Sequence, residues 1–167
     1  MSGRKLALAA LAVTALLTAG CGAVARVTEG NPAQGKALFK KDCGSCHVLE
    51  NAGTKGLSSL PLEEQPPNLD NAFSAPKEQG FDITTITDVV RGQIAYPDSR
   101  EGTICRNTIK TKLGKGLSCV TTPGMLANLV HGQDAADVAV YVALCADKPK
   151  CDVRDATYNV DTQSYQS

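Results

Sequence analysis

The residues best suited by type and spacing to carry chemistry are the five of Cys43–His47, which read CGSCH. Two cysteines separated by two residues can form a redox dithiol, supply half of a zinc site or attach a haem. A histidine directly after the second cysteine is typical of haem attachment. Two thiols one helical turn apart can each add to a haem vinyl group, and the next residue then places its imidazole on the iron.

The residues around the motif favour haem over the other two interpretations. A zinc site needs a second ligand pair, but the sequence has no second C-x-x-C and its only other histidine is His131. A thioredoxin-like dithiol expects a strand before the motif. The preceding NPAQGKALFKKDC instead begins with Asn31, a good N-cap, and Pro32, which suits the first helical position. We therefore expect the motif at the end of a helix, with a haem attached through Cys43 and Cys46.

The iron of such a haem would take His47 as one axial ligand and needs a second. After Met1 the chain contains one methionine, Met125, in a Pro/Gly-bearing loop before a strongly helical segment. A thioether ligand stabilises reduced iron and raises the reduction potential. We predict Met125 as the second ligand. His131 is the alternative, and it would give a bis-histidine centre of lower potential.

The N-terminus has the features of an export signal. A basic pair precedes Leu6–Leu17, an apolar run of twelve residues that is too short to span a bilayer. The LTAGC that follows resembles a bacterial lipoprotein signal, in which Cys21 becomes the acylated N-terminus. We expect residues 1–20 to be a signal peptide and residues 21–30 a tether. The protein would lie on the outer face of the cell membrane, held by its lipid, or in the periplasm.

The seven cysteines of an exported chain need partners, because free thiols tend to oxidise there. Lipid on Cys21 and the two motif cysteines account for three. The remaining four can form two disulfides, and we predict Cys105–Cys119 and Cys145–Cys151 because each pair closes a short local loop.

Length and charge bound the other possibilities. A chain of 167 residues has the length of a single domain. Without Arg4 and Lys5 of the signal, fifteen cationic side chains face seventeen acidic ones, a net charge of −2. That balance argues against nucleic acid as a partner. Aromatic residues make up only 4 % and tryptophan is absent, so a bulky apolar cofactor would help to fill the core.

The order of these features resembles a class I monohaem c-type cytochrome over about residues 31–146. An N-terminal helix, CGSCH, PPNL, PGM and a C-terminal helix follow one another as in that family. The resemblance implies an all-α fold, with helices wrapped around one covalently attached haem c, in a domain of residues 31–151. It is followed by a polar tail, residues 152–167.

Three stretches strengthen the resemblance. GKALF (Gly35–Phe39) looks like the family's N-terminal helix, whose glycine lets the C-terminal helix cross closely. DVAVYV (Asp137–Val142) is similar to that crossing helix. PPNL (Pro66–Leu69) looks like the family's Gly-Pro-Asn-Leu turn with proline in place of glycine. The resemblance implies that the Pro67 carbonyl accepts a hydrogen bond from His47 and orients its ring.

The sequence patterns of two further segments predict their structure. Thr84–Ile94 has Ile86, Val89, Val90 and Ile94 at helical spacing, and all four are expected in the core. Residues 99–121 are an insertion relative to a compact family member and carry four cationic residues between Arg106 and Lys115. We expect a disulfide-pinned loop. It could be a basic docking lip near the haem edge or simply solvated surface.

These features predict a single-electron carrier and not an enzyme, because the sequence shows no catalytic triad and no paired catalytic carboxylates. The family resemblance implies transient partners: a quinol-oxidising complex or dehydrogenase as donor and a terminal oxidase as acceptor. Three alternatives stay open. The chain could be the electron-entry subunit of a larger redox complex, a thiol–disulfide oxidoreductase without haem, or a gas-binding or peroxidatic haem protein whose sixth iron position is open.

Overall fold

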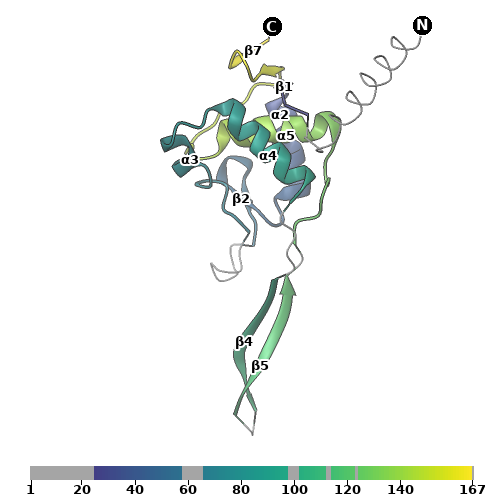
Figure 1. Cartoon of the computed structure of the whole chain (residues 1–167), viewed down its shortest axis with the longest axis vertical. Coiled ribbons are helices and arrows are strands. Elements are labelled where there is room, and N and C mark those ends of the chain that lie inside the picture. The colour runs from purple at the N-terminus through teal and green to yellow at the C-terminus, as the bar shows by residue number, and fades with distance from the viewer. Residues whose placement is uncertain (1–24, 58–65, 98–101, 112–113, 123, 167) are drawn as a thin grey trace, which may run out of the picture.

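The protein is a mostly helical body from which one long β-hairpin projects (Figure 1). The structure is a computed structural model that describes residues 25–57, 66–97, 102–111, 114–122 and 124–166. The body contains four described α-helices: α2 (Pro32–Leu38), α3 (Ser74–Glu78), α4 (Ile83–Ala95) and α5 (Gly132–Cys145). Within the described residues, no helix is both long and apolar enough to cross a membrane.

Helix α2 begins and packs as its sequence predicts. The Asn31 side chain caps it by accepting hydrogen bonds from the backbone amides of Ala33 and Gln34, at 3.0 and 3.2 Å. Gly35 faces α5 so closely that a Cβ there would overlap the Asp137 carbonyl and lie 2.8 Å from the Cβ of Tyr141. The absence of a side chain at Gly35 therefore sets the crossing of the two helices.

The central helix α5 is apolar on nearly all sides because other elements cover it. Its residues from Val138 to Ala143 are all buried, against α2, α4 and strand β1 (Glu29–Gly30). The Tyr141 ring packs against Phe39 of the first helical segment, with ring centroids 6.1 Å apart. The core of the body thus lies where the two predicted family helices cross.

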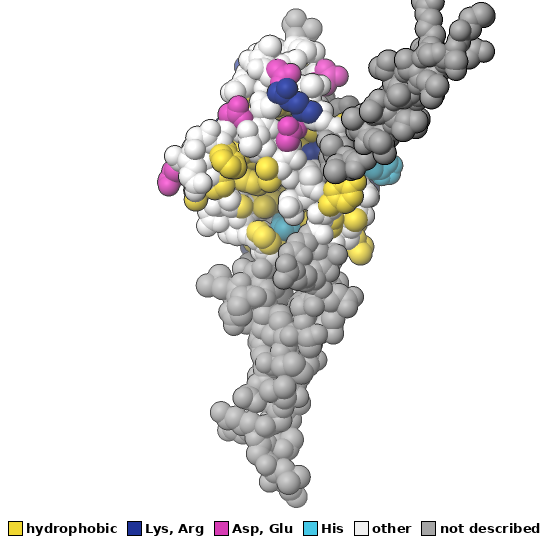
Figure 2. Space-filling view, viewed as in Figure 1, with side chains coloured by type: hydrophobic (Ala, Val, Ile, Leu, Met, Phe, Trp, Pro, Cys, Tyr) yellow, Lys and Arg dark blue, Asp and Glu magenta, His cyan; other side chains and the backbone are white. Residues whose placement is uncertain are grey.

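Helix α4 buries a face that differs from the predicted one. Ile86, Val90 and Ile94 are buried at four-residue spacing, and Thr87 and Ala95 are buried beside them. Val89 was expected in the core as well, but 43 % of its surface is exposed. That prediction is wrong because Val89 lies beside the stripe that packs on the body. Figure 2 shows that exposed hydrophobic side chains, in yellow, occur on this face of the body.

Residues 25–30 and 158–165 join the folded body. Strand β6 (Tyr158–Asn159) pairs with β1 (Glu29–Gly30) on one side and with β7 (Ser164–Tyr165) on the other. Val27 is buried against Val140, Tyr158 and Val160. The fold therefore includes residues 25–30 of the predicted tether and most of the predicted tail. The apolar residues of these two segments pack against each other and are buried.

The insertion is a β-hairpin where the sequence predicted a loop. Strand β4 (Gly102–Thr111) pairs with β5 (Gly114–Thr122), and the register shifts between Asn107 and Ile109. Cys105 and Cys119 are register partners across the pair. Gly102 and Gly114 begin the two strands and Pro123 follows the second, so the sequence does contain signals of strand ends that the loop prediction did not take into account.

The Cys145–Cys151 disulfide is present, as predicted. It links the last residue of α5 to the segment that leads into the C-terminal strands. The Asn51 side chain contacts the same region, accepting a hydrogen bond from the Cys151 amide at 2.8 Å and donating to the carbonyl of Lys148.

Candidate functional site

The C-x-x-C-H motif begins where the first helical segment ends. α2 continues into a π-helical turn, Phe39–Cys43, and the Gly44 amide closes it with a hydrogen bond of 2.8 Å to the Phe39 carbonyl. Such turns occur frequently at functional sites. Cys43 at the end of the turn is buried, whereas Cys46 is exposed. The two thiols therefore lie on one short stretch of chain at the border of the core, and neither forms a disulfide.

His47 is held by backbone groups on two sides. Its amide donates to the Cys43 carbonyl at 2.9 Å, and its ring atom Nδ1 lies 3.0 Å from the Pro67 carbonyl oxygen. A carbonyl can only accept, so this contact requires the proton on Nδ1. The lone pair is then on Nε2, the nitrogen that a metal would use.

The segment that carries Pro67 is tied to the strand that follows His47. The Leu69 amide donates to the Val48 carbonyl at 3.0 Å, and the Asp70 side chain accepts from the Glu50 amide at 2.7 Å. These two bonds fix the distance between the two stretches of chain. The position of the Pro67 carbonyl therefore follows from backbone pairing.

Two residues that the sequence analysis missed support the motif. The Thr54 hydroxyl accepts from the Leu49 amide at 3.0 Å and lies 3.0 Å from the His47 carbonyl. It belongs to β3 (Thr54–Lys55), which pairs with β2 (Val48–Leu49). Gly56 has φ = +48°, and a Cβ there would lie 2.5 Å from the Cys46 carbonyl. Two glycines at positive φ, Gly53 and Gly56, flank Thr54–Lys55, and they are the sequence signal for this tight turn.

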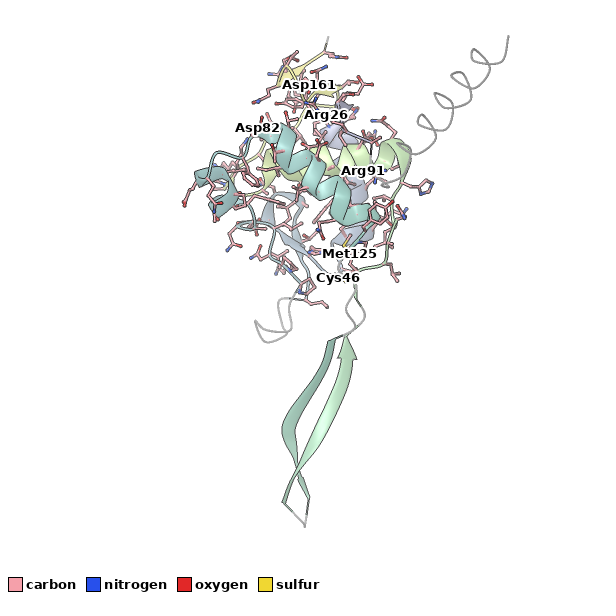
Figure 3. All side chains as sticks on the ribbon, viewed as in Figure 1. Arg26, Cys46, Asp82, Arg91, Met125 and Asp161 are labelled. Carbon is pink, nitrogen blue, oxygen red and sulfur yellow. A yellow bond between two sulfur atoms is a disulfide. The ribbon has the colours of Figure 1, made fainter. Side chains whose placement is uncertain are left out.

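Met125 is partly buried and packs against the core cluster that includes Cys43. Its loop is tied to the end of α4 by a hydrogen bond of 2.8 Å from the Asn128 amide to the Ile94 carbonyl. Figure 3 shows Met125 and Cys46 at the same end of the helical body. His131, the alternative ligand, is exposed and precedes α5 at its N-cap position without a side-chain hydrogen bond to the helix.

Cys43 does not have the electrostatics of a nucleophilic cysteine. Burial, with smaller contributions from Asp42 and Cys46, raises the pKa of the Cys43 thiol to about 11. Reactive cysteines of disulfide oxidoreductases have lowered pKa values, because the thiolate is the nucleophile. Among the described residues, no group of three or more Cys, His, Asp or Glu is placed to hold a metal ion. The arrangement combines a buried thiol at Cys43, an exposed thiol at Cys46 and one oriented imidazole.

The structure leaves two predicted sites untested, the lipidation of Cys21 and the Cys105–Cys119 disulfide. Cys21, the predicted lipid-bearing residue, lies outside the described residues. For Cys105 and Cys119 the structure gives the backbone register alone. Opposed residues of an antiparallel pair have Cα atoms about 4.5 or 5.5 Å apart, and both spacings suit a disulfide. Their disulfide stays a prediction.

A comparison with known protein families supports the interpretation of the C-x-x-C-H motif as a haem attachment site. The family model described as cytochrome c matches residues 32–103, which include α2, the C-x-x-C-H motif, the Pro67 segment and α4. Comparisons with curated proteins and with solved structures gave no match.

Proposed function

We propose that this chain is an extracytoplasmic single-electron carrier with His47 and Met125 as axial ligands. The match of the cytochrome c family model to residues 32–103 supports this, because domains of that family carry one covalent haem c and transfer electrons. Cys43 and Cys46 would hold the haem as thioethers. The proposal is more specific than the family, because it names the ligands, the compartment and the role.

The observation that carries the proposal is the contact between His47 Nδ1 and the Pro67 carbonyl, at 3.0 Å. It leaves Nε2 as the basic nitrogen of a ring whose orientation is already fixed. Ring orientation by a second hydrogen bond is a common feature of histidines that ligate metals. The contact thus matches a residue prepared to bind iron.

The donor set fits a c-type haem. When bound, haem supplies iron that changes oxidation state by one electron. Cys46 is exposed, and Cys43 lies at the border of the core. Met125 contributes a soft sulfur from a loop that packs on the same core cluster. The chain's own task is to fix the positions of these side chains.

We propose that the chain is exported and held by lipid on Cys21, on the outer face of the membrane. Because residues 25–30 pair and pack with the C-terminal strands, only residues 22–24 would separate the acylated residue from the folded body. A fully extended chain spans at most about 3.6 Å per residue. The body would then lie close to the membrane surface and turn little relative to it.

We propose that the partners are redox proteins that bind transiently. A quinol-oxidising complex or a dehydrogenase would donate the electron and a terminal oxidase would accept it. The alternative, a permanent electron-entry subunit of a larger complex, predicts a partner that co-purifies in fixed ratio. Purification from the native membrane in mild detergent distinguishes the two, because a transient carrier elutes alone.

The proposal is tested by an absorption spectrum of residues 22–167, matured with a cytochrome c assembly system. We expect a low-spin haem in both oxidation states and, in the ferric form, the weak far-red band of a bound methionine sulfur. Met125→Ala should abolish that band, whereas His131→Ala should leave it. A low-spin ferric haem without the band would assign the ligand to His131. A high-spin haem would contradict the carrier role, and a colourless protein would contradict haem attachment.

A further inference from the structure

The outer side of helix α4 carries no charged residue. Thr85, Val89, Gly92 and Tyr96 follow one another at spacings of four, three and four residues, so they share one side of the helix. We call these four residues the α4 outer face. The buried residues of α4 lie on the other side, and a surface helix normally has charged residues opposite its buried side. The α4 outer face therefore differs from an ordinary solvated helix surface.

Large apolar side chains are exposed along this part of the protein. Val89 and Tyr96 of the α4 outer face are exposed, and so is Phe81, which directly precedes the N-cap residue of the helix. Figure 1 shows α4 on the side of the body toward the viewer. In the same view, Figure 2 shows hydrophobic side chains across the middle of the body, whereas the charged ones lie mostly toward the end with the C-terminal strands. This side of the body thus combines exposed apolar groups with few charges.

The N-terminal segment joins the body beside the same helix. The Val27 amide donates a hydrogen bond of 3.0 Å to the side chain of Asp88, which lies in the middle of α4. The proposed acylation site, Cys21, is four residues before residue 25, where the described chain begins. Four residues span at most about 14 Å when fully extended. The lipid on Cys21 would therefore enter the bilayer close to α4, and the side of the body that carries α4 would face the membrane.

We infer that the α4 outer face lies on the phospholipid bilayer, with Val89 and Tyr96 among the headgroups. The inference rests on the proposed function, since it needs the lipid anchor at Cys21. Tyrosine is enriched at the membrane–water interface because its ring is apolar and its hydroxyl is polar. A helix that lies on a membrane buries its apolar side about 5–10 Å into the boundary of headgroups and acyl chains. The anchor keeps the body at the membrane, and the α4 outer face determines which side meets the lipid.

This orientation would decide where the C-x-x-C-H motif points. Figure 3 shows Cys46 and Met125 at the lower edge of the body in the same view. With the α4 side against the lipid, that edge points along the membrane surface. A redox partner embedded in the same membrane would then meet the motif by lateral diffusion.

The test measures how fast a water-soluble maleimide modifies Val89→Cys in the mature, haem-loaded protein. One sample is the lipidated protein on vesicles of phosphatidylethanolamine and phosphatidylglycerol, and the other is residues 22–167 in solution, without the lipid. The matched control is Ala37→Cys, at an exposed position of α2. Figure 1 shows α2 behind α5 and α4 in front of it, so the control lies on the other side of the body. Peptide mapping identifies the modified cysteine, and this reading does not depend on haem.

We expect Val89→Cys to react at least about tenfold more slowly on vesicles than in solution, because burying one apolar side chain shifts an equilibrium by that factor or more. The control should react at nearly the same rate in both samples. Equal rates for Val89→Cys in the two samples, or an equal slowing of the control, would overturn the inference. So would slowing that disappears at a low ratio of protein to lipid, because a second copy of the chain would then cover the face.

Mass spectrometry of the mature protein measures the acylation of Cys21 separately. A mature protein without lipid contradicts the proposed anchor and the inference with it. An acylated protein in which Val89→Cys stays fully reactive contradicts the inference alone.

Discussion

Replacing Gly35 by alanine should destabilise the protein more than any other change of one methyl group at a described glycine. The added Cβ would overlap the backbone carbonyl of Asp137 and lie 2.8 Å from the Cβ of Tyr141. Neither neighbour is the end of a flexible side chain. The two helices α2 and α5 would have to separate where the core is most completely buried.

The magnitude follows from the nature of the obstruction. Overpacking a well-packed core costs about 1–3 kcal/mol, and an obstruction by backbone belongs at the upper end, about 3 kcal/mol. For a chain of this size each kcal/mol shifts the melting temperature by about 2–4 °C. Gly35→Ala should therefore lower it by about 6–12 °C. Thermal unfolding followed by circular dichroism measures the shift directly.

Gly92→Ala is the matched control. Gly92 lies inside α4, and a Cβ there meets no atom within 4 Å. Alanine in a helix interior is more favourable than glycine by about 0.5–1 kcal/mol, so the melting temperature should rise slightly. A Gly35→Ala protein that melts within about 2 °C of the unchanged one, well short of the shift expected from overpacking, would refute the argument that the missing side chain sets this crossing.

Three further predictions concern single contacts. Thr54→Val keeps the side-chain shape but leaves a buried backbone amide without its acceptor, so chemical denaturation should show a loss of about 1–3 kcal/mol; an unchanged midpoint would contradict the bond's role. Asp82 caps α4, and hydrogen bonds from Thr85 lower its pKa below 3.8. Its stabilisation is therefore present at neutral pH and is lost as the pH falls through the lowered value. The melting temperatures of Asp82→Ala and the unchanged protein should differ at pH 7 and converge below that pKa. A non-reducing digest should yield one peptide pair joined through Cys105 and Cys119, and free thiols there would refute the disulfide.

The features that could be predicted from the sequence are those set by residues close together in the chain or by a family pattern. Asn31 and Pro32 mark the start of α2 because capping and the fixed φ of proline act within one turn. The glycine of GKALF and the crossing helix were recognised from the family pattern, and the close contact at Gly35 confirms them. Cys145 and Cys151 are near in sequence, so loop closure alone indicated their pairing.

The features that escaped prediction depend on distant residues. Val27 and Val160 become part of a small core only because residues 25–30 meet residues 158–165, and neither segment shows this alone. The exposure of Val89 is decided by which face of α4 meets the body. The hairpin register, with Lys110 opposite Lys115, depends on an irregularity between Asn107 and Ile109 that composition does not reveal.

The contact at Pro67 shows why a departure from the family pattern need not disturb a site. Pro66 stands where the resembled turn has glycine, which put the geometry of the turn in question. The acceptor for His47 is a backbone carbonyl, and every residue type supplies one. What must be preserved is the placement of that carbonyl, and the Leu69–Val48 hydrogen bond supplies it from the following residues. Two consecutive prolines also restrict the chain before folding, so less conformational entropy is lost when the carbonyl is fixed. Proline can therefore replace the glycine here because the turn is held by its neighbours.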